Sequence, residues 1–283
     1  MKKFKSISVV ATIVVLGIVA IVGGYIYTTT DAYQAKKLYN KLGNDYTASQ
    51  CDSLTKRFPN SEYAELAQEK KRSLLRQQAE WNSISSNPSV QGLKTFKKKH
   101  ELTAKYSNAA DEKIDSLLWI EALNSKLEQA YEEYAALGQM ARNYNETMNV
   151  LQWMHKLPEV ASVSEQLKEQ SKKFFEILGN GDAKAVAGLC SDTISLFLYH
   201  QNYTPAKVVD FVNSVYCKNI KQRTFVITSD IELSKARIAA DKAGYAALFN
   251  VDLTAPSKIA RKHKATILFT LEGKIASIAL HHL

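Results

Sequence analysis

The chain has 283 residues, of which 46% are hydrophobic and 23% are charged, and its formal net charge is +9. This length can hold one large domain or two ordinary ones. Its lysines are scattered among acidic residues instead of forming a stripe, which excludes the pattern of a nucleic-acid-binding protein, so we expect no nucleic-acid partner. Its three cysteines are too few and too dispersed for a disulfide-stapled scaffold.

The first 30 residues have the pattern of a transmembrane signal anchor. Three lysines, at positions 2, 3 and 5, precede an uncharged run over residues 6–30, which Asp31 ends. About 20 apolar residues suffice to cross a bilayer core, and lysines held on the cytoplasmic side orient the N-terminus inside. We therefore predict a single-pass protein of the bacterial inner membrane with its bulk in the periplasm. The residues expected in the anchor are Val9, Val14, Leu16, Ile18, Ile21, Tyr25 and Tyr27.

A cleaved secretory signal is the alternative interpretation of this segment. The apolar region of such a signal has about 7 to 15 residues and ends at a small-x-small site. The run here is longer and finishes in Gly23-Gly24-Tyr25-Ile26-Tyr27. Either interpretation exports the rest of the chain.

Residues 31–164 are predicted to be entirely helical. They are rich in Ala, Leu, Glu, Lys and Gln, and their apolar residues recur at spacings of three and four, as on amphipathic helices. Helix breaks are expected at Phe58-Pro59-Asn60-Ser61, around Pro88, and at Leu157-Pro158.

A weak internal repeat lies within this helical region. The order aromatic, turn, Tyr, Ala in residues 54–67 recurs in residues 93–110, at a period of roughly 40 residues, which is typical of helical-hairpin arrays. Over residues 33–120 the chain resembles tetratricopeptide-type repeats of bacterial envelope proteins. The resemblance implies an extended protein-binding surface. The simpler interpretation of the Trp and Tyr residues is hairpin core, and the sequence singles out no residues for a binding groove.

Residues 165–283 are predicted to combine helices with long antiparallel strands. Helices are expected over residues 167–178, 182–189 and 204–216, with a strand over 194–200 between the last two. Apolar and polar residues then alternate over 225–233 and 245–253, and again before and after a turn at Gly273.

The segment Phe174–Val186, in which a helix ends in Gly-Asn-Gly-Asp before a short helix, and the closing segment LEGKIASIAL resemble the nuclear transport factor two superfamily, also called SnoaL-like. The resemblance implies a cone-shaped curved sheet around helices, and a possible homodimer through that sheet. The overall class is thus α+β, with a transmembrane helix, a helical-hairpin repeat region and a C-terminal cone. Its candidate pocket residues are Phe174, Phe197, Tyr199, Phe211, Tyr216, Tyr245 and Phe249, although large apolar side chains usually serve as core.

Little in the sequence indicates catalysis. An enzyme of this fold would need an ionisable pair inside the cone, and the nearby candidates are Asp210, Asp230 and His200. Both carboxylates are expected to face solvent, and no catalytic motif can be transferred. No phosphate-binding loop or zinc-ligand pattern is present, so we predict no cofactor and no metal, with His281-His282 at most an incidental contact.

The cysteines leave two alternatives open. Cys190 and Cys217 pair in an oxidising compartment and leave Cys51 alone, or the thiols are free and buried.

These patterns favour a non-catalytic, membrane-anchored, extracytoplasmic protein of the bacterial envelope that binds a protein partner or a ligand. The alternative is an enzyme of the isomerase or dehydratase type that acts on a small hydrophobic substrate in the cone. A purely structural spacer is a third hypothesis, because fold alone does not fix function.

Overall fold

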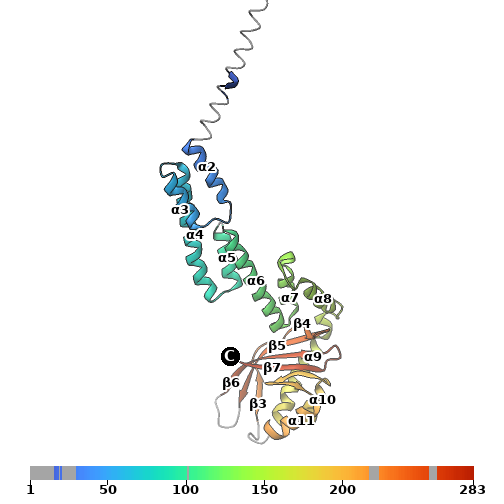
Figure 1. Cartoon of the computed structure of the whole chain (residues 1–283). Coiled ribbons are helices and arrows are strands. Elements are labelled where there is room, and N and C mark those ends of the chain that lie inside the picture. The colour runs from blue at the N-terminus through green and yellow to red at the C-terminus, as the bar shows by residue number, and fades with distance from the viewer. Residues whose placement is uncertain (1–15, 19, 21–29, 101, 217–222, 255–259) are drawn as a thin grey trace, which may run out of the picture. The chain divides into compact units, whose positions relative to one another are not determined.

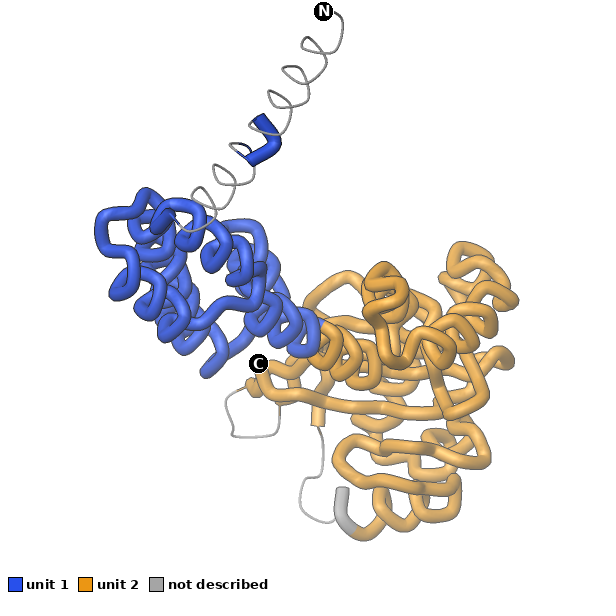
Figure 2. The backbone as a smooth tube through the Cα atoms, turned by 45° about the horizontal axis from the view of Figure 1, so that its top comes forward, with its two compact units in different colours: residues 1–114 blue, residues 115–283 orange. Residues whose placement is uncertain are grey.

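The computed structural model describes residues 16–18, 20, 30–100, 102–216, 223–254 and 260–283 (Figure 1). The chain divides into two compact units, Met1–Ile114 and Asp115–Leu283 (Figure 2). The sequence placed the boundary at 164/165 instead.

Most of the predicted anchor lies outside the described residues. Among its seven named residues, only Leu16 and Ile18 are described; both are helical, and they are 62% and 55% exposed. In the part of the chain that the structure describes, no helix has both the length and the apolar composition needed to cross a bilayer. The anchor therefore stays a prediction.

The first unit is built from helical hairpins. Its helices are α2 (Asp31–Leu42), α3 (Ala48–Arg57), α4 (Glu62–Ser86), α5 (Val90–Lys99) and the start of α6 (Ala104–Ser125). The predicted breaks at 58–61 and around Pro88 are confirmed, because the side chains of Ser61 and Ser89 accept hydrogen bonds from the first turns of α4 and α5.

Small residues and aromatic rings form the cores of these hairpins. Cys51, Ala64 and Ala67 are buried where α3 meets α4. Further along the chain, the Trp81 ring lies 5.8 Å from that of Phe96 and 6.0 Å from that of Tyr106, measured between centroids. Phe96 and Tyr106 are buried, which agrees with the interpretation as core, and Trp81 is half-buried.

The second unit begins within α6 and includes two further helices that the sequence assigned to the helical region. They are α7 (Glu128–Ala135) and α8 (Tyr144–His155), and both pack against strand β4 (Glu232–Ala239). Arg237 on this strand donates a hydrogen bond of 2.9 Å to Glu146, and Leu127 forms an isolated β-bridge with Ala236. These contacts join α7 and α8 to the sheet within the second unit.

The remaining helices of this unit are α9 (Val160–Asn180), α10 (Ala183–Leu189), α11 (Pro205–Phe211) and a π-helical turn over Val212–Tyr216. Apolar side chains of α9, α10 and α11 share one core with the sheet. Figure 1 shows these helices beside the strands. Gly181, in the left-handed conformation, ends α9, and Asp182 caps α10, as the sequence predicted.

The sheet is open and curled, which confirms the predicted α+β class. Its strands are β1 (Ile194–Leu198), β2 (His200–Tyr203), β3 (Thr224–Ile227), β4, β5 (Lys242–Thr254), β6 (Arg261–Phe269) and β7 (Ile275–His282). Their order is β2-β1-β7-β6-β5-β3, and β4 also pairs with β5.

Three details of the sheet differ from the prediction. Strand β1 pairs with β7 in parallel, so the sheet is not purely antiparallel. The strand predicted over 194–200 turns at Leu198 and returns as β2. The extended stretch 225–233 is two strands, β3 and β4, because the chain leaves the ladder near Ser229, whose hydroxyl accepts a hydrogen bond from the Asn250 N–H.

Gly244 marks a close backbone approach inside the sheet. A Cβ atom at this position would lie 2.1 Å from the carbonyl oxygen of Phe269 and 3.1 Å from the Ile238 side chain. Because the clashing atom is a backbone oxygen of Phe269, the clash can be relieved only by a shift of β5 relative to β6.

We predict that Gly244→Ala lowers the free energy of unfolding of the C-terminal unit by more than about 3 kcal/mol. Steric strain in a packed region is one of the mechanisms by which a single substitution destabilises a protein strongly. The matched control is Gly188→Ala in α10, where a Cβ would meet nothing within 4 Å. This control should be neutral or stabilising by up to about 1 kcal/mol. Urea unfolding compares the two, and equal stability of both variants would contradict the assignment.

His263 is a buried imidazole in β6. It is 2% exposed, its Nδ1 atom lies 3.0 Å from the Arg261 carbonyl oxygen, and its ring centroid lies 4.5 Å from that of His282. Burial lowers the pKa of His263 below its ordinary value of 6.5, and the nearby His282 acts in the same direction.

The folded unit should therefore lose stability in acid. The unfolded chain takes up a proton on this side chain near pH 6.5, whereas the folded chain does so only at lower pH. The contribution is fully present above pH 6.5 and is lost as the pH falls toward the depressed pKa. We predict that His263→Gln flattens this part of the pH profile of the thermal unfolding temperature and that exposed His281→Gln does not. Identical profiles for wild type and His263→Gln would refute the role of His263.

Candidate functional site

The interior of the C-terminal unit, where the sequence placed a pocket, is filled by its own side chains. Phe174, Phe197, Tyr245 and Phe249 are between 0% and 3% exposed. The ring centroids of Phe174 and Phe197 lie 6.2 Å apart at an interplanar angle of 74°, an edge-to-face arrangement. The Tyr245 hydroxyl donates a hydrogen bond of 2.9 Å to the carbonyl oxygen of Pro158. These four predicted pocket residues are therefore core residues.

The other three predicted pocket residues lie elsewhere. Phe211 is half-buried, with its ring centroid 5.9 Å from that of Phe197. Tyr199 is 63% exposed at the turn between β1 and β2, so it does not line the interior. The side chain of Tyr216 lies outside the described part of the chain.

The ionisable groups considered for catalysis are on the surface. Asp210, Asp230 and His200 are all exposed, in agreement with the expectation that the two carboxylates face solvent. His200 stacks on Tyr203 with a centroid distance of 5.4 Å. None of these three groups lies inside the cone, where acid–base chemistry on an enclosed substrate would require it.

The described cysteines are buried thiols. Cys51 and Cys190 are free, and the Cys190 thiol donates to the Val186 carbonyl oxygen over 3.4 Å. Burial raises the pKa of Cys190 to about 12, so this thiol is almost entirely protonated and unreactive at neutral pH. Cys217 lies outside the described residues, so its pairing stays untested.

Among the described residues there is one cluster of potential metal ligands, although the sequence predicted no metal. Ligand atoms of Glu128, Glu132 and His155 lie within 4.8 Å of one another. Glu132 and His155 are exposed, and His155 Nε2 lies 3.6 Å from Glu128 Oε1, the geometry of a surface ion pair. Exposed groups of this kind commonly occur without a metal.

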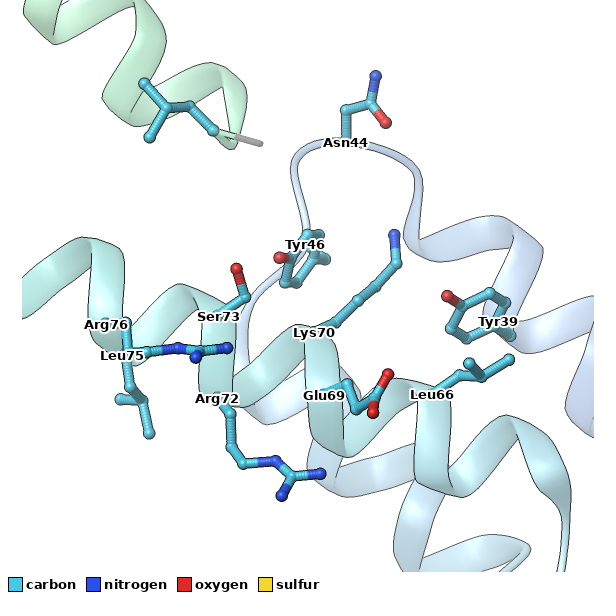
Figure 3. A pocket seen from close by; sticks show the side chains of 11 residues that line it. Tyr39, Asn44, Tyr46, Leu66, Glu69, Lys70, Arg72, Ser73, Leu75 and Arg76 are labelled. Atoms are coloured by element: carbon cyan, nitrogen blue, oxygen red, sulfur yellow. The ribbon is translucent and has the colours of Figure 1, made fainter. Parts of the chain in front are cut away.

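A hollow of about 1020 Å³ lies on the helical unit, along α4. Its lining residues come from α4, from α2 and the loop that follows it, and from the segment before α6 (Figure 3). They are Tyr39, Asn44, Tyr46, Leu66, Glu69, Lys70, Arg72, Ser73, Leu75, Arg76 and Leu102. We call this surface, together with its continuation described below, the α4 groove.

Lys70 is held at one side of this groove by aromatic rings. Its Nζ atom lies 4.7 Å from the ring centroid of Tyr46 and 5.3 Å from that of Tyr39, and it donates to the Gly43 carbonyl oxygen over 3.2 Å. Figure 3 shows Lys70 reaching toward these rings, whereas Arg72 points away from them. Cation–π contacts of this kind fix the position of the ammonium group while leaving its charge in place.

The groove continues along α4 into a second hollow of about 630 Å³, which shares Ser73 and Arg76 with the first. Its other lining residues include Glu80, Lys99 and His100. The Glu80 carboxylate accepts a hydrogen bond from Lys99 Nζ over 2.8 Å and lies 2.7 Å from His100 Nε2. The bond from Lys99, followed by that from His100, lowers the pKa of Glu80.

The charge of the groove is therefore positive. Arg72 and Arg76 are exposed, and neither forms an ion pair with any residue in the described ranges. Lys99 offsets the charge of Glu80 through an ion pair of 2.8 Å, which leaves Glu69 as the acidic side chain facing the three basic residues of the first hollow.

A buried glutamine fixes the wall of the groove. Gln77 on α4 is 0% exposed, and its Oε1 accepts a hydrogen bond of 3.2 Å from the Thr103 N–H. Its Nε2 donates to the Ser73 hydroxyl over 3.2 Å. A satisfied buried amide of this kind rigidifies its surroundings, so the groove exists before any partner binds.

Sequence reasoning missed this site because it looked for a pocket in the cone. The available signal was Lys70, Arg72 and Arg76 within two turns of one amphipathic helix, all basic and close to exposed Leu75. That signal did not identify the opposite wall, since Tyr39, Tyr46 and Leu102 reach the groove from other elements.

One of three comparisons with known proteins found similar structures. No protein-family model matches this chain, and no curated protein matches it either. Solved structures that resemble it are of the nuclear transport factor 2-like and ketosteroid-isomerase type and cover about 43% of the chain. The tetratricopeptide-type resemblance of the helical region stays a prediction.

Three of these structures illustrate the likeness. Nuclear transport factor 2 from Cryptosporidium parvum is 14% identical, with 42% of this chain and 94% of that chain covered and a TM-score of 0.33. ActVI-ORFA from Streptomyces coelicolor is 13% identical, with 44% and 97% covered and a TM-score of 0.33. A protein from Catenulispora acidiphila is 13% identical, with 43% and 92% covered and a TM-score of 0.32.

Proposed function

We propose that this protein is a non-catalytic binding protein of the bacterial envelope, anchored in the inner membrane, which recognises a protein partner through the α4 groove. One contrast carries the proposal. The interior of the C-terminal unit is occupied by buried aromatic rings, whereas the helical unit presents an open, preformed groove whose two arginines form no ion pair with the described residues. Concave surfaces with a few convergent polar groups are the usual places for binding.

The proposed location rests on the N-terminal sequence. The lysines at positions 2, 3 and 5 and the uncharged run over 6–30 support a single-pass anchor with a cytoplasmic N-terminus. Both units would then lie in the periplasm. A homodimer through the C-terminal sheet is also part of the proposal and would give that unit an assembly role in place of an enzymatic one.

The enzymatic alternative lacks a supporting observation. It needs an ionisable pair facing a substrate inside the cone. Asp210, Asp230 and His200 are exposed, and the buried hydroxyl of Tyr245 already donates to a backbone carbonyl.

Site-specific photo-cross-linking in intact membranes tests the proposal. A photoreactive amino acid is placed at Leu75 in the groove or at Ile120 on α6, which are matched at 49% and 53% exposed. We expect a discrete cross-linked partner from Leu75 and none from Ile120, because only the first lies in the groove. The chain should also stay with the membrane pellet after an alkaline wash.

The absence of any adduct at Leu75, or the same adduct at both positions, would contradict recognition through the groove. Release of the chain by the wash would contradict the anchor.

A further inference from the structure

We infer that the occupant of the α4 groove is an acidic peptide segment of the partner, with apolar residues among its carboxylates. This inference rests on the proposed function, and it adds the chemistry that selects the partner.

Charge gives the first argument. The first hollow places Lys70, Arg72 and Arg76 against a single carboxylate, Glu69. The planar guanidinium group binds a carboxylate through two parallel hydrogen bonds, and both arginines are without an ion-pair partner among the described residues. Without the three lysines at positions 2, 3 and 5, which the proposed topology places in the cytoplasm, the net charge of +9 is still +6, and this charge favours an acidic occupant of the groove.

Spacing gives the second argument. Arg72 and Arg76 are four residues apart on one helix, which places their Cβ atoms about 5–6 Å apart on the same face. Carboxylates one turn apart on a helix, or two residues apart on a strand, have a comparable separation. An acidic segment in either conformation can therefore engage both guanidinium groups at once.

The apolar contacts and the length complete the description of the ligand. Leu66 and Leu75 line the groove at 40% and 49% exposed, so they offer contact to apolar side chains of the segment. The groove runs along α4 from Leu66 to Glu80, about 21 Å at 1.5 Å per residue. About six extended residues span that length. At the far end Lys99 forms an ion pair with Glu80, so an acidic ligand meets a carboxylate that is already paired there.

A phospholipid surface shares the negative charge but fits the site less well. A bilayer surface contacts a flat or convex face of a protein. These basic residues instead line a hollow, together with Asn44 and Ser73. Their amide and hydroxyl groups suit the backbone of a peptide. We therefore commit to the peptide and make anionic vesicles an arm of the test.

The test measures fluorescence anisotropy of a labelled peptide of alternating Glu and Leu with the full chain in detergent, alongside the same peptide with Gln in place of Glu. The groove variant is Arg72→Glu with Arg76→Glu. The matched control is Lys94→Glu with Lys98→Glu on α5, which has the same spacing and charge change but does not line either hollow. Arg76→Gln is a milder second variant, and circular dichroism checks that all variants keep their helix content.

We expect the Glu peptide to bind more tightly than the Gln peptide, with an affinity that falls as salt is added. The groove variant should weaken binding at least about tenfold, since reversing charges at a contact is strongly unfavourable. The control variant should change the affinity by less than about threefold, because it alters only the long-range electrostatic potential at the groove.

Equal losses in the two charge-reversal variants, or equal binding of the two peptides, would overturn the inference. So would vesicles of phosphatidylglycerol that bind in a manner dependent on Arg72 and Arg76 while the peptide does not. If the Leu75 cross-link persists without binding of the Glu peptide, the acidic partner is wrong and the proposed function stands. If both fail, the proposed function fails as well.

Discussion

The C-terminal unit depends on a set of phenylalanine rings that close its interior. Phe174 and Phe175 on α9 meet edge to face, and each also contacts a strand: Phe174 packs on Phe197 and Phe175 on Phe249. Each ring removes a large apolar area from water, and edge-to-face pairs add to that stabilisation. Because the sheet curls around α9, β1 and β5 both pack against this helix. The concave face of the sheet is therefore filled by a core and does not enclose a pocket.

A closed interior leaves the surface as the place where a partner can bind. The α4 groove is open because long side chains line it from three directions, and it is rigid because Gln77 and the Lys70 cation–π contacts hold its walls. Exposed basic side chains without ion-pair partners lower the stability of the fold mainly by repelling one another. At an exposed site, salt screens that repulsion. Arg72 and Arg76 can therefore remain available for a ligand.

The sequence predicted most helices and strands, but it did not predict which surface they form for binding. Capping residues such as Ser61, Ser89 and Asp182 located helix starts, because caps are local interactions. The parallel pairing of β1 with β7 could not be predicted, since it joins residues about 80 positions apart and no local pattern encodes it. The same limit applies to the site: aromatic residues in an alternating strand indicate burial, but only the assembled unit decides whether Phe197 and Tyr245 line a cavity or fill it.

The most direct test of this account is the effect of Phe197→Ala on the hydrogen exchange of the β5–β7 amides, converted to a free energy of opening of the C-terminal unit. Because the ring is 0% exposed and packed against Phe174, the account predicts a loss of about 3–5 kcal/mol. Tyr199→Ala, two residues away and 63% exposed, should cost less than about 1 kcal/mol. A similarly small loss at Phe197 would mean that its ring borders an open pocket, and the binding site would then belong inside the cone.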